Sequence, residues 1–129
     1  MKRESKIGDS HIITISDNGM VGVPSNVRMS ISEIASLFDI YYQTAKKNIR
    51  SIEKSGIATG DDSMGSYVER MKVYPDYYGL EMIIALAFRI RSYRTEIFRN
   101  WMVRKLTTML VPQEFLINFQ SDIDKIILN

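Results

Sequence analysis

Residues 41–50 bring together side chains that are able to contact a nucleic acid. Glutamine can pair with the edge of an adenine base through two hydrogen bonds, and threonine and tyrosine can bond to bases or phosphates. Lysine and arginine neutralise phosphate charge and so fix the position of a protein along a duplex. We therefore expect base contacts from Tyr42, Gln43 and Thr44 and phosphate contacts from Lys46, Lys47 and Arg50, with Tyr41 beside them.

The residues around this segment predict a helix-turn-helix across positions 30–56. Ser30 and Glu33 have the spacing of a capping box, which marks the start of a first helix. A second helix, from about residue 42 to 54, can end at Gly56 in the left-handed conformation. In this arrangement the outer face of the second helix enters the major groove of DNA. The residues that would pack the two helices together are Ile31, Ile34, Ala35, Leu37, Phe38, Ile40, Ala45, Ile49 and Ile52.

Asp39 stands in the turn of this motif, where glycine is usual. Aspartate tolerates a left-handed backbone better than most residues, so the turn remains feasible. Amphipathic helix pairs also occur in domains that never touch DNA, and motif matches include false positives. The alternative therefore stays open that the helix-turn-helix is architectural and that the C-terminal helices bind a protein partner.

The basic residues fall in two clusters, although the net charge is only +2, from 17 Lys and Arg against 15 Asp and Glu. Residues 41–54 hold four basic residues against Glu53, and residues 89–105 hold six against Glu96. Such clusters are typical of surfaces that contact phosphates. Some arginines of the second cluster are expected to pair with Glu96 or Asp76. The second basic surface would be formed by Arg89, Arg91, Arg94 and Arg99.

The alternation of apolar and polar residues from Tyr67 to Tyr74 predicts a strand, closed by Pro75 and Asp76. Arg70 and Lys72 are two positions apart, so a single strand would place both side chains on one face. A strand that follows a helix-turn-helix can belong to a wing that touches the DNA backbone. We therefore add Arg70 and Lys72 to the candidate DNA contacts.

Residues with catalytic chemistry are few, and no enzymatic function is expected. The chain has no cysteine and one histidine, His11, which has no Ser or Asp at a recognisable motif spacing. No phosphate-binding, dinucleotide-binding or metalloprotease motif occurs. The close acidic pairs, Asp61-Asp62 and Asp122 with Asp124, are typical of a solvated loop and a polar helix face. We expect no catalytic residue, cofactor, metal or small-molecule substrate.

The elements predict one α+β domain over residues 1–129, mostly helical and similar to a winged helix. It would consist of a β-hairpin at 10–24, the helix-turn-helix at 30–56, a loop and wing strand at 57–78, and C-terminal helices at 79–129, one of which Thr95 can cap after a break near Ser92. No apolar run is long enough to span a bilayer, so a cytoplasmic protein without a membrane partner is expected. The last helix carries an apolar stripe that is either core or the seam of a homodimer: Leu116, Phe119, Ile123 and Ile126.

Three ordered blocks resemble the RhuM-type family of bacterial virulence-associated proteins, which is similar in design to the Bro-N-like amino-terminal domains of phage antirepressors. The first block joins 34–38 to 48–52, the second runs from 80–84 into 88–92, and the third comprises Arg94, Phe98, Arg99 and Trp101. Arg28 and the run 95–97 depart from the family pattern. The resemblance implies a DNA-binding module in transcriptional regulation or in antirepressor-like control of a mobile element.

Overall fold

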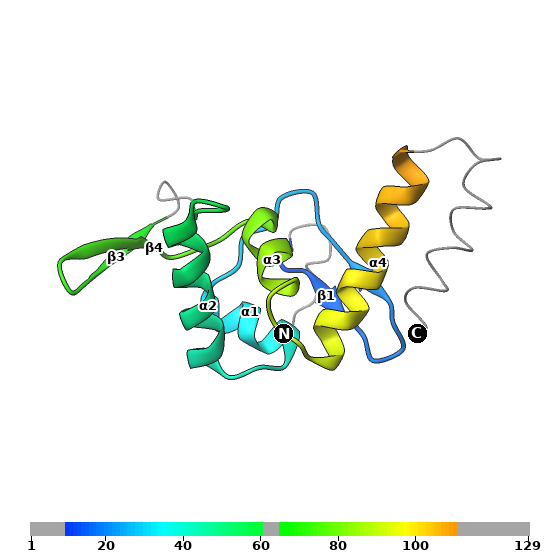
Figure 1. Ribbon diagram of the computed structural model, residues 1–129, viewed down its shortest axis with the longest axis horizontal. Coiled ribbons are helices and arrows are strands. Elements are labelled where there is room, and N and C mark those ends of the chain that lie inside the picture. Colours follow the sequence, from blue (N-terminus) through cyan, green and yellow to red (C-terminus); the bar gives the residue numbers. More distant parts are fainter. Residues whose placement is uncertain (1–9, 61–64, 111–129) are drawn as a thin grey trace.

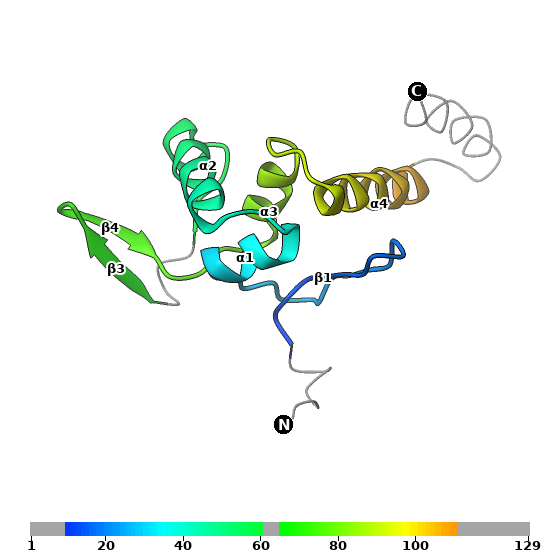
Figure 2. The ribbon, with the colours of Figure 1, turned by 90° about the horizontal axis from the view of Figure 1, so that it is seen from below.

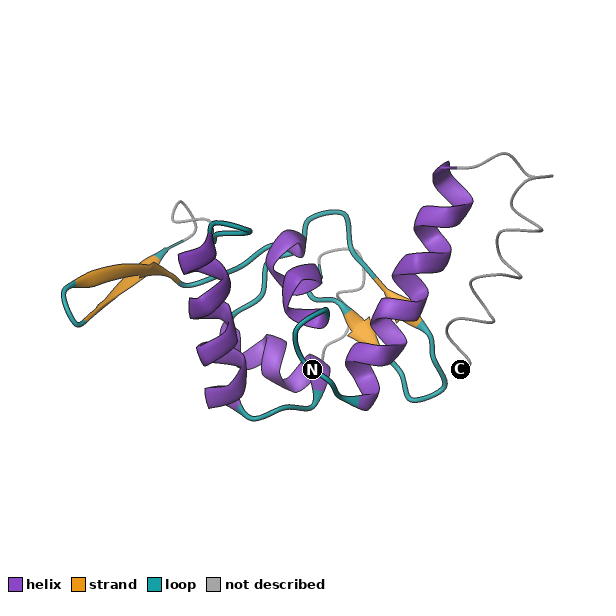
Figure 3. Cartoon of the chain, viewed as in Figure 1, coloured by secondary structure: helices purple, strands orange, loops and turns teal. Residues whose placement is uncertain are grey.

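The computed structural model describes residues 10–60 and 65–110 and shows an α+β fold with four helices and two antiparallel hairpins in these ranges (Figure 1). In chain order the elements are β1 (Thr14–Ile15), β2 (Val21–Gly22), α1 (Ile31–Phe38), α2 (Tyr42–Ser55), β3 (Ser66–Glu69), β4 (Lys72–Pro75), α3 (Leu80–Ala87) and α4 (Tyr93–Leu110). The β3–β4 hairpin projects beyond α2 at one end of the molecule, and α4 lies toward the other end (Figures 1 and 3). Seen from below, the hairpin again extends away from the helices (Figure 2).

The local signals predicted for the two helices of residues 30–56 are confirmed where they concern the start of α1 and the ends of both helices. The Ser30 hydroxyl accepts a hydrogen bond from the Glu33 amide at 3.2 Å, and the Glu33 carboxylate accepts one from the Ser30 amide at 2.8 Å. Asp39 ends α1 in the left-handed conformation at φ 55°, and Gly56 ends α2 at φ 83°. Helix α1 therefore begins at its predicted capping box, and α2 ends at the predicted Gly56.

The core lies between α1, α2, α3 and the first half of α4. Phe38 of α1 and Phe98 of α4 are fully buried with ring centroids 5.9 Å apart, and Trp101 stacks on Phe98 at 5.8 Å. Burying a side chain of this size contributes roughly 1.5–3 kcal/mol, so this contact anchors α4 against α1. The remaining apolar helical side chains with no exposed surface are Ile34, Ala45, Ile49, Ile52, Met82, Ile83, Leu86 and Ala87.

The predicted single strand over residues 67–74 is wrong, because the segment folds into the β3–β4 hairpin. Arg70 and Met71 form its two-residue turn, with φ angles of 51° and 68°. Apolar and polar residues alternate on both sides of the turn, so the segment resembles one continuous strand. The turn itself contains no Gly or Asn, which are the usual sequence signal of a hairpin. Arg70 consequently lies in the turn, and not with Lys72 on one face of a strand.

Ser92, and not the predicted Thr95, precedes the first residue of α4. The Ser92 hydroxyl accepts from the Thr95 amide at 3.1 Å, and the Ser92 amide donates to the Thr95 hydroxyl at 2.8 Å. The Ser92 hydroxyl also donates to the carbonyl of Phe38 at 2.8 Å, which fixes the α3–α4 connection to the end of α1. The helix start was misplaced because Thr95 replaces the glutamate of a usual capping box.

Some of the remaining predictions concern residues that the structure does not describe, and one concerns the described helices. The apolar stripe Leu116, Phe119, Ile123 and Ile126 lies outside the described residues, as do Asp61-Asp62 and Asp122 with Asp124. Within residues 10–60 and 65–110, none of the helices combines the length and hydropathy needed to traverse a bilayer.

Candidate nucleic-acid interface

Helix α2 separates an inner apolar side from an outer polar side. Ala45, Ile49 and Ile52 point into the core, with no exposed surface. Gln43 and Lys47 are exposed, and Thr44 is half-buried. At the start of the helix, Tyr41 is 84% and Tyr42 44% exposed, and no side chain caps the first amides of α2. The predicted base-reading residues therefore lie on the accessible side of the helix.

Lys46 and Arg50 point from α2 to the β3–β4 hairpin. The ammonium of Lys46 lies 2.9 Å from a carboxylate oxygen of Glu69, and the Arg50 guanidinium is 3.9 Å from the other oxygen. The hydrogen bond from Lys46 is the main cause that lowers the pKa of Glu69, and the same bond raises the pKa of Lys46. Glu69 therefore neutralises part of the predicted phosphate-binding charge.

Arg50 is the centre of an aromatic and ionic cluster. Its guanidinium carbon lies 3.7 Å from the ring centre of Tyr74, and its nitrogens donate to the hydroxyls of Tyr67 and Tyr78, the latter at 2.9 Å. It also forms an ion pair with Glu53 at 3.2 Å. A planar guanidinium can stack and donate several hydrogen bonds at once, which lysine cannot do. Arg50 therefore joins α2 to both strands of the hairpin.

Tyr78 completes this cluster from the segment before α3. Its hydroxyl accepts from Arg50 and donates to Glu53 at 3.0 Å, while the residue as a whole is only 1% exposed. Burial, followed by the charge of Glu53, raises the pKa of Tyr78 well above its ordinary value. The phenol therefore remains protonated at neutral pH and keeps its hydrogen bond to Glu53. Antiparallel bonds between Met29 and Tyr78 hold the backbone in place.

Arg89 and Arg91, from the α3–α4 connection, lie beside α2. The Arg89 guanidinium donates to the hydroxyl of Ser51, in the C-terminal half of α2, at 2.8 Å. Arg91 lines a shallow hollow of about 480 Å³ together with Tyr41 and Thr44 at the start of α2. Part of the second basic cluster therefore adjoins the first. We call this combined surface the α2 face; its residues are Tyr41, Tyr42, Gln43, Thr44, Lys47, Arg89 and Arg91.

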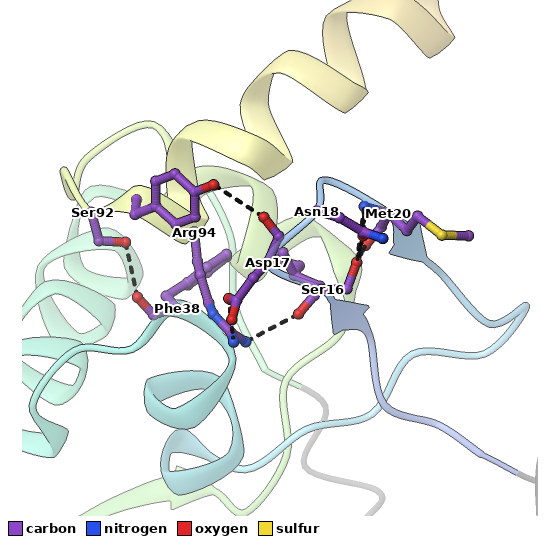
Figure 4. A network of polar contacts seen from close by, with 9 residues as sticks. Ser16, Asp17, Asn18, Met20, Phe38, Ser92 and Arg94 are labelled. Carbon is purple, nitrogen blue, oxygen red and sulfur yellow. Dashed lines mark hydrogen bonds and ion pairs between the residues drawn. The ribbon is translucent and has the colours of Figure 1, made fainter.

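Arg94 and Arg99 are engaged in the fold. Arg94 reaches from α4 to the turn between β1 and β2, where it donates to the Ile15 carbonyl and pairs with Asp17, both at 3.0 Å (Figure 4). Arg99 donates to the carbonyls of Ala87 and Ile90, at 2.7 and 3.1 Å, and so satisfies the end of α3. Among the described residues, Arg94 thus pairs with Asp17, where the sequence suggested Glu96 or Asp76.

The hairpin presents further cations near α2. Arg70 and Lys72 are exposed, and neither forms an ion pair with another residue of the described ranges. Lys72 lines a hollow of about 380 Å³ with Lys54 and Arg50. The opposite side of the hairpin exposes Val68 at 69% and Val73 at 61%, and the turn exposes Met71 at 96%.

Several residues that hold this arrangement together are absent from the site predicted from the sequence. Tyr67, Glu69 and Tyr74 share one face of the hairpin, and Tyr78 approaches them from the segment before α3. Tyr67 and Glu69 are two positions apart, so they lie on one face of a strand, and this spacing can be read from the sequence. The spacing identifies the face only once the position of the hairpin turn is known. His11 has a local role, since its Nδ1 lies 2.9 Å from the carbonyl of Asn26.

Comparison with protein-family models, with curated proteins and with solved structures finds no match to the chain. The similarity to RhuM-type proteins therefore stays an expectation from the sequence. Within the described ranges, no three His, Asp or Glu side chains gather where they could bind a metal ion. The chemistry available at the α2 face is that of cations, hydroxyls, an amide and aromatic rings, which suits a polyanion with planar bases.

Proposed function

We propose that the protein binds duplex DNA in the manner of a winged helix, with α2 in the major groove. The observation that carries the proposal is the α2 face, on which cations from two separate segments border one exposed helix. Lys47 lies on α2, while Arg89 and Arg91 come from about 40 residues later in the chain. The uncapped start of α2 adds backbone amides and the positive end of a helix dipole, both of which favour phosphate.

The candidate residues would act in two ways: some contact base edges, and the others fix the position of the protein or of its hairpin on the DNA backbone. Tyr42, Gln43 and Thr44 would meet base edges, because they occupy the first turn of α2, and the N-terminal residues of recognition helices are the ones that contact bases. Lys47, Arg89 and Arg91 would hold phosphates beside the groove. Lys46 and Arg50 act through the hairpin, which they fix beside α2, and Arg70 and Lys72 would contact a further stretch of backbone.

The biological setting follows from the sequence resemblance alone. RhuM-type and antirepressor-like proteins suggest transcriptional regulation or control of a mobile element. A DNA-binding domain of this size would serve either role by occupying an operator.

The test is a titration of end-labelled duplex DNA, about 30 base pairs long, at several salt concentrations. The wild-type dissociation constant should rise with salt, and Lys47→Ala should weaken binding and reduce the slope of log K against log salt by about 1. Lys105→Ala is the matched control, because Lys105 is exposed on α4 and contacts Trp101 away from α2. Absence of binding at low salt, or equal effects of the two substitutions, would contradict the proposal.

A protein-interaction module is the second candidate function. It is favoured by the end of α4, where Leu106, Met109 and Leu110 are 51%, 75% and 74% exposed. An apolar surface of this kind suits a partner protein. Replacing Met109 and Leu110 with lysine should abolish a protein complex and leave DNA affinity unchanged, so pull-down and DNA titration on one variant separate the two functions.

A further inference from the structure

We propose that the tip of the β3–β4 hairpin enters the minor groove of DNA and that Met71 inserts between base pairs as an apolar wedge. This inference rests on the proposed function and specifies how the hairpin engages the same partner. Met71 is 96% exposed, the highest value among the exposed large apolar residues of the described ranges. Side chains such as methionine are used in this way by proteins that unstack a base step and kink the duplex.

The hairpin is held firmly enough to act as a wedge. Its inner face packs on α2 through the Lys46–Glu69 ion pair and through Arg50, which stacks on Tyr74 and bonds to Tyr67. The Lys46–Glu69 pair reaches the residue directly before the turn, and the tip itself extends beyond α2 (Figures 1 and 2). The tip is therefore positioned relative to α2 while remaining accessible.

The turn itself is built against the usual preference. Both Arg70 and Met71 adopt positive φ angles, which glycine and asparagine favour and which cost other residues energy. An Asn-Gly turn would relieve this strain but would remove both long side chains from the tip. The chain thus keeps a cation and a flexible apolar group at the most exposed point of the hairpin.

Charge favours DNA over an apolar protein surface as the occupant. Arg70 and Lys72 flank Met71, and Glu69, the acid nearest to the turn, is already neutralised by Lys46 and Arg50. The tip therefore presents two cations around an apolar side chain, which complements a groove lined by phosphates. Val68 and Val73 widen the apolar surface behind Met71.

The position of the hairpin selects the minor groove. With α2 in the major groove, an element that reaches sideways past the helix crosses one phosphate backbone and meets the neighbouring minor groove. The undistorted minor groove is too narrow for a two-stranded ribbon, so entry requires it to open. Insertion of an apolar side chain provides that opening, because it unstacks a base step and bends the duplex toward the major groove.

The experiment measures DNA bending by energy transfer across a duplex of about 30 base pairs that contains several flexible TA steps. Donor and acceptor dyes are attached to opposite ends, and the full-length protein is added to saturation. Wild type should increase energy transfer, and Met71→Ala should remove most of that increase while lowering affinity by no more than ~10-fold, since the phosphate contacts remain. Met20→Ala is the matched control, because Met20 is 71% exposed beside the turn of the other hairpin.

The outcomes separate the two proposals. A wild-type protein that binds no duplex at low salt removes the proposed function, and the wedge with it. A wild-type protein that binds without bending, or a Met71→Ala variant that bends DNA as wild type does, overturns the wedge alone and assigns the apolar side of the hairpin to a protein partner. Loss of bending in Met71→Ala, with Met20→Ala unchanged, supports it.

Discussion

Arg50 illustrates how the role of one residue depends on its partners. It lies on the predicted recognition helix and has the charge of a phosphate contact, yet its guanidinium is occupied by Tyr67, Tyr74, Tyr78 and two glutamates. Each donor that bonds within the protein is unavailable to a phosphate. Its neighbour Lys47 has no such partner among the described residues and remains exposed on the same helix.

Replacing Arg50 should therefore reduce the stability of the protein more than its affinity for DNA phosphates. We expect Arg50→Ala to lower the free energy of unfolding by about 1–3 kcal/mol, because it leaves the Tyr78 hydroxyl without its donor. Arg50→Lys should recover little, since an ammonium cannot stack on Tyr74 and bond to two phenols together. Denaturant unfolding measures both, with Lys47→Ala, expected within about 0.5 kcal/mol of wild type, as the surface control. Equal stability of wild type and Arg50→Ala would contradict this role.

Glu69 gives the hairpin a predictable dependence on pH. Its pKa is lowered below 4.5 by the hydrogen bond from Lys46, so the pair stabilises the fold above that pH and its contribution is lost as pH falls through the native pKa. The hydrogen bond to Glu69 raises the pKa of Lys46 above its ordinary value of 10.5. The ion pair therefore also weakens when the pH rises through this raised pKa. A carboxyl NMR titration of Glu69 should show a lower midpoint in wild type than in Lys46→Ala.

The control for this dependence is Glu69→Gln. Between about pH 5 and 10 wild type should be the more stable protein, and the difference should shrink below the native pKa of Glu69. A Glu69 midpoint that Lys46→Ala leaves unchanged would show that the ion pair does not form in solution.

At the scale of elements, the two hairpins of the described ranges serve different purposes. The β1–β2 hairpin is fixed to α4 by Arg94 and by the Tyr93 hydroxyl, which donates to the Asp17 carbonyl at 3.0 Å. The β3–β4 hairpin contacts α2 through Tyr74 and Glu69, the latter directly before the turn, and carries a strained, exposed tip. Strain that persists at an exposed turn is typical of a functional site.

Relieving the backbone strain in this turn should raise the stability of the protein while lowering its affinity for DNA. The double substitution Arg70→Asn with Met71→Gly introduces the preferred residues for two positive φ angles and should raise stability by roughly 0.5–1.5 kcal/mol. DNA affinity should fall, because the tip loses its cation and its apolar group. Thermal unfolding and DNA titration on the same preparation test this trade-off, and a variant that gains stability without losing affinity would exclude the tip from the interface.

At the scale of the whole molecule, the second basic cluster divides into two groups. The fold turns the chain sharply between α3 and α4, because Ser92 bonds to both Phe38 and Thr95. Arg89 and Arg91, before this turn, lie beside α2, whereas Arg94 and Arg99, after it, bind backbone carbonyls. The charge of the cluster is therefore shared between the α2 face and the internal packing of the protein.

This division predicts opposite phenotypes for two arginines only five positions apart. Arg89→Ala should weaken DNA binding and lower the salt slope by about 1, with little effect on stability. Arg94→Ala should cost about 1–2 kcal/mol of stability through its bond to the Ile15 carbonyl, since the pair with the 82%-exposed Asp17 adds little. Its DNA affinity should match wild type at a temperature where both are folded. The reverse pattern, measured by titration and thermal unfolding, would refute the division.

The sequence alone determined the features that depend on near neighbours. The capping box of α1, the left-handed Asp39 and Gly56, and the buried faces of α1 and α2 all depend on residues within a few positions of one another, so local preferences suffice to place them. The sequence did not predict the β3–β4 turn or the start of α4, because Arg70-Met71 and Thr95 replace the residues that usually mark such sites.

Only the tertiary structure decided which cations are available to a partner. Lys46 meets Glu69 from 23 residues away, Arg50 meets Tyr78 from 28, and Arg89 meets Ser51 from 38. A side chain carries the same charge in any fold, but whether that charge is paired depends on what the chain brings within a few ångströms. For that reason the sequence could locate two basic clusters, whereas the packing of α2 against the hairpin and the α3–α4 connection determined which cations lie on the α2 face.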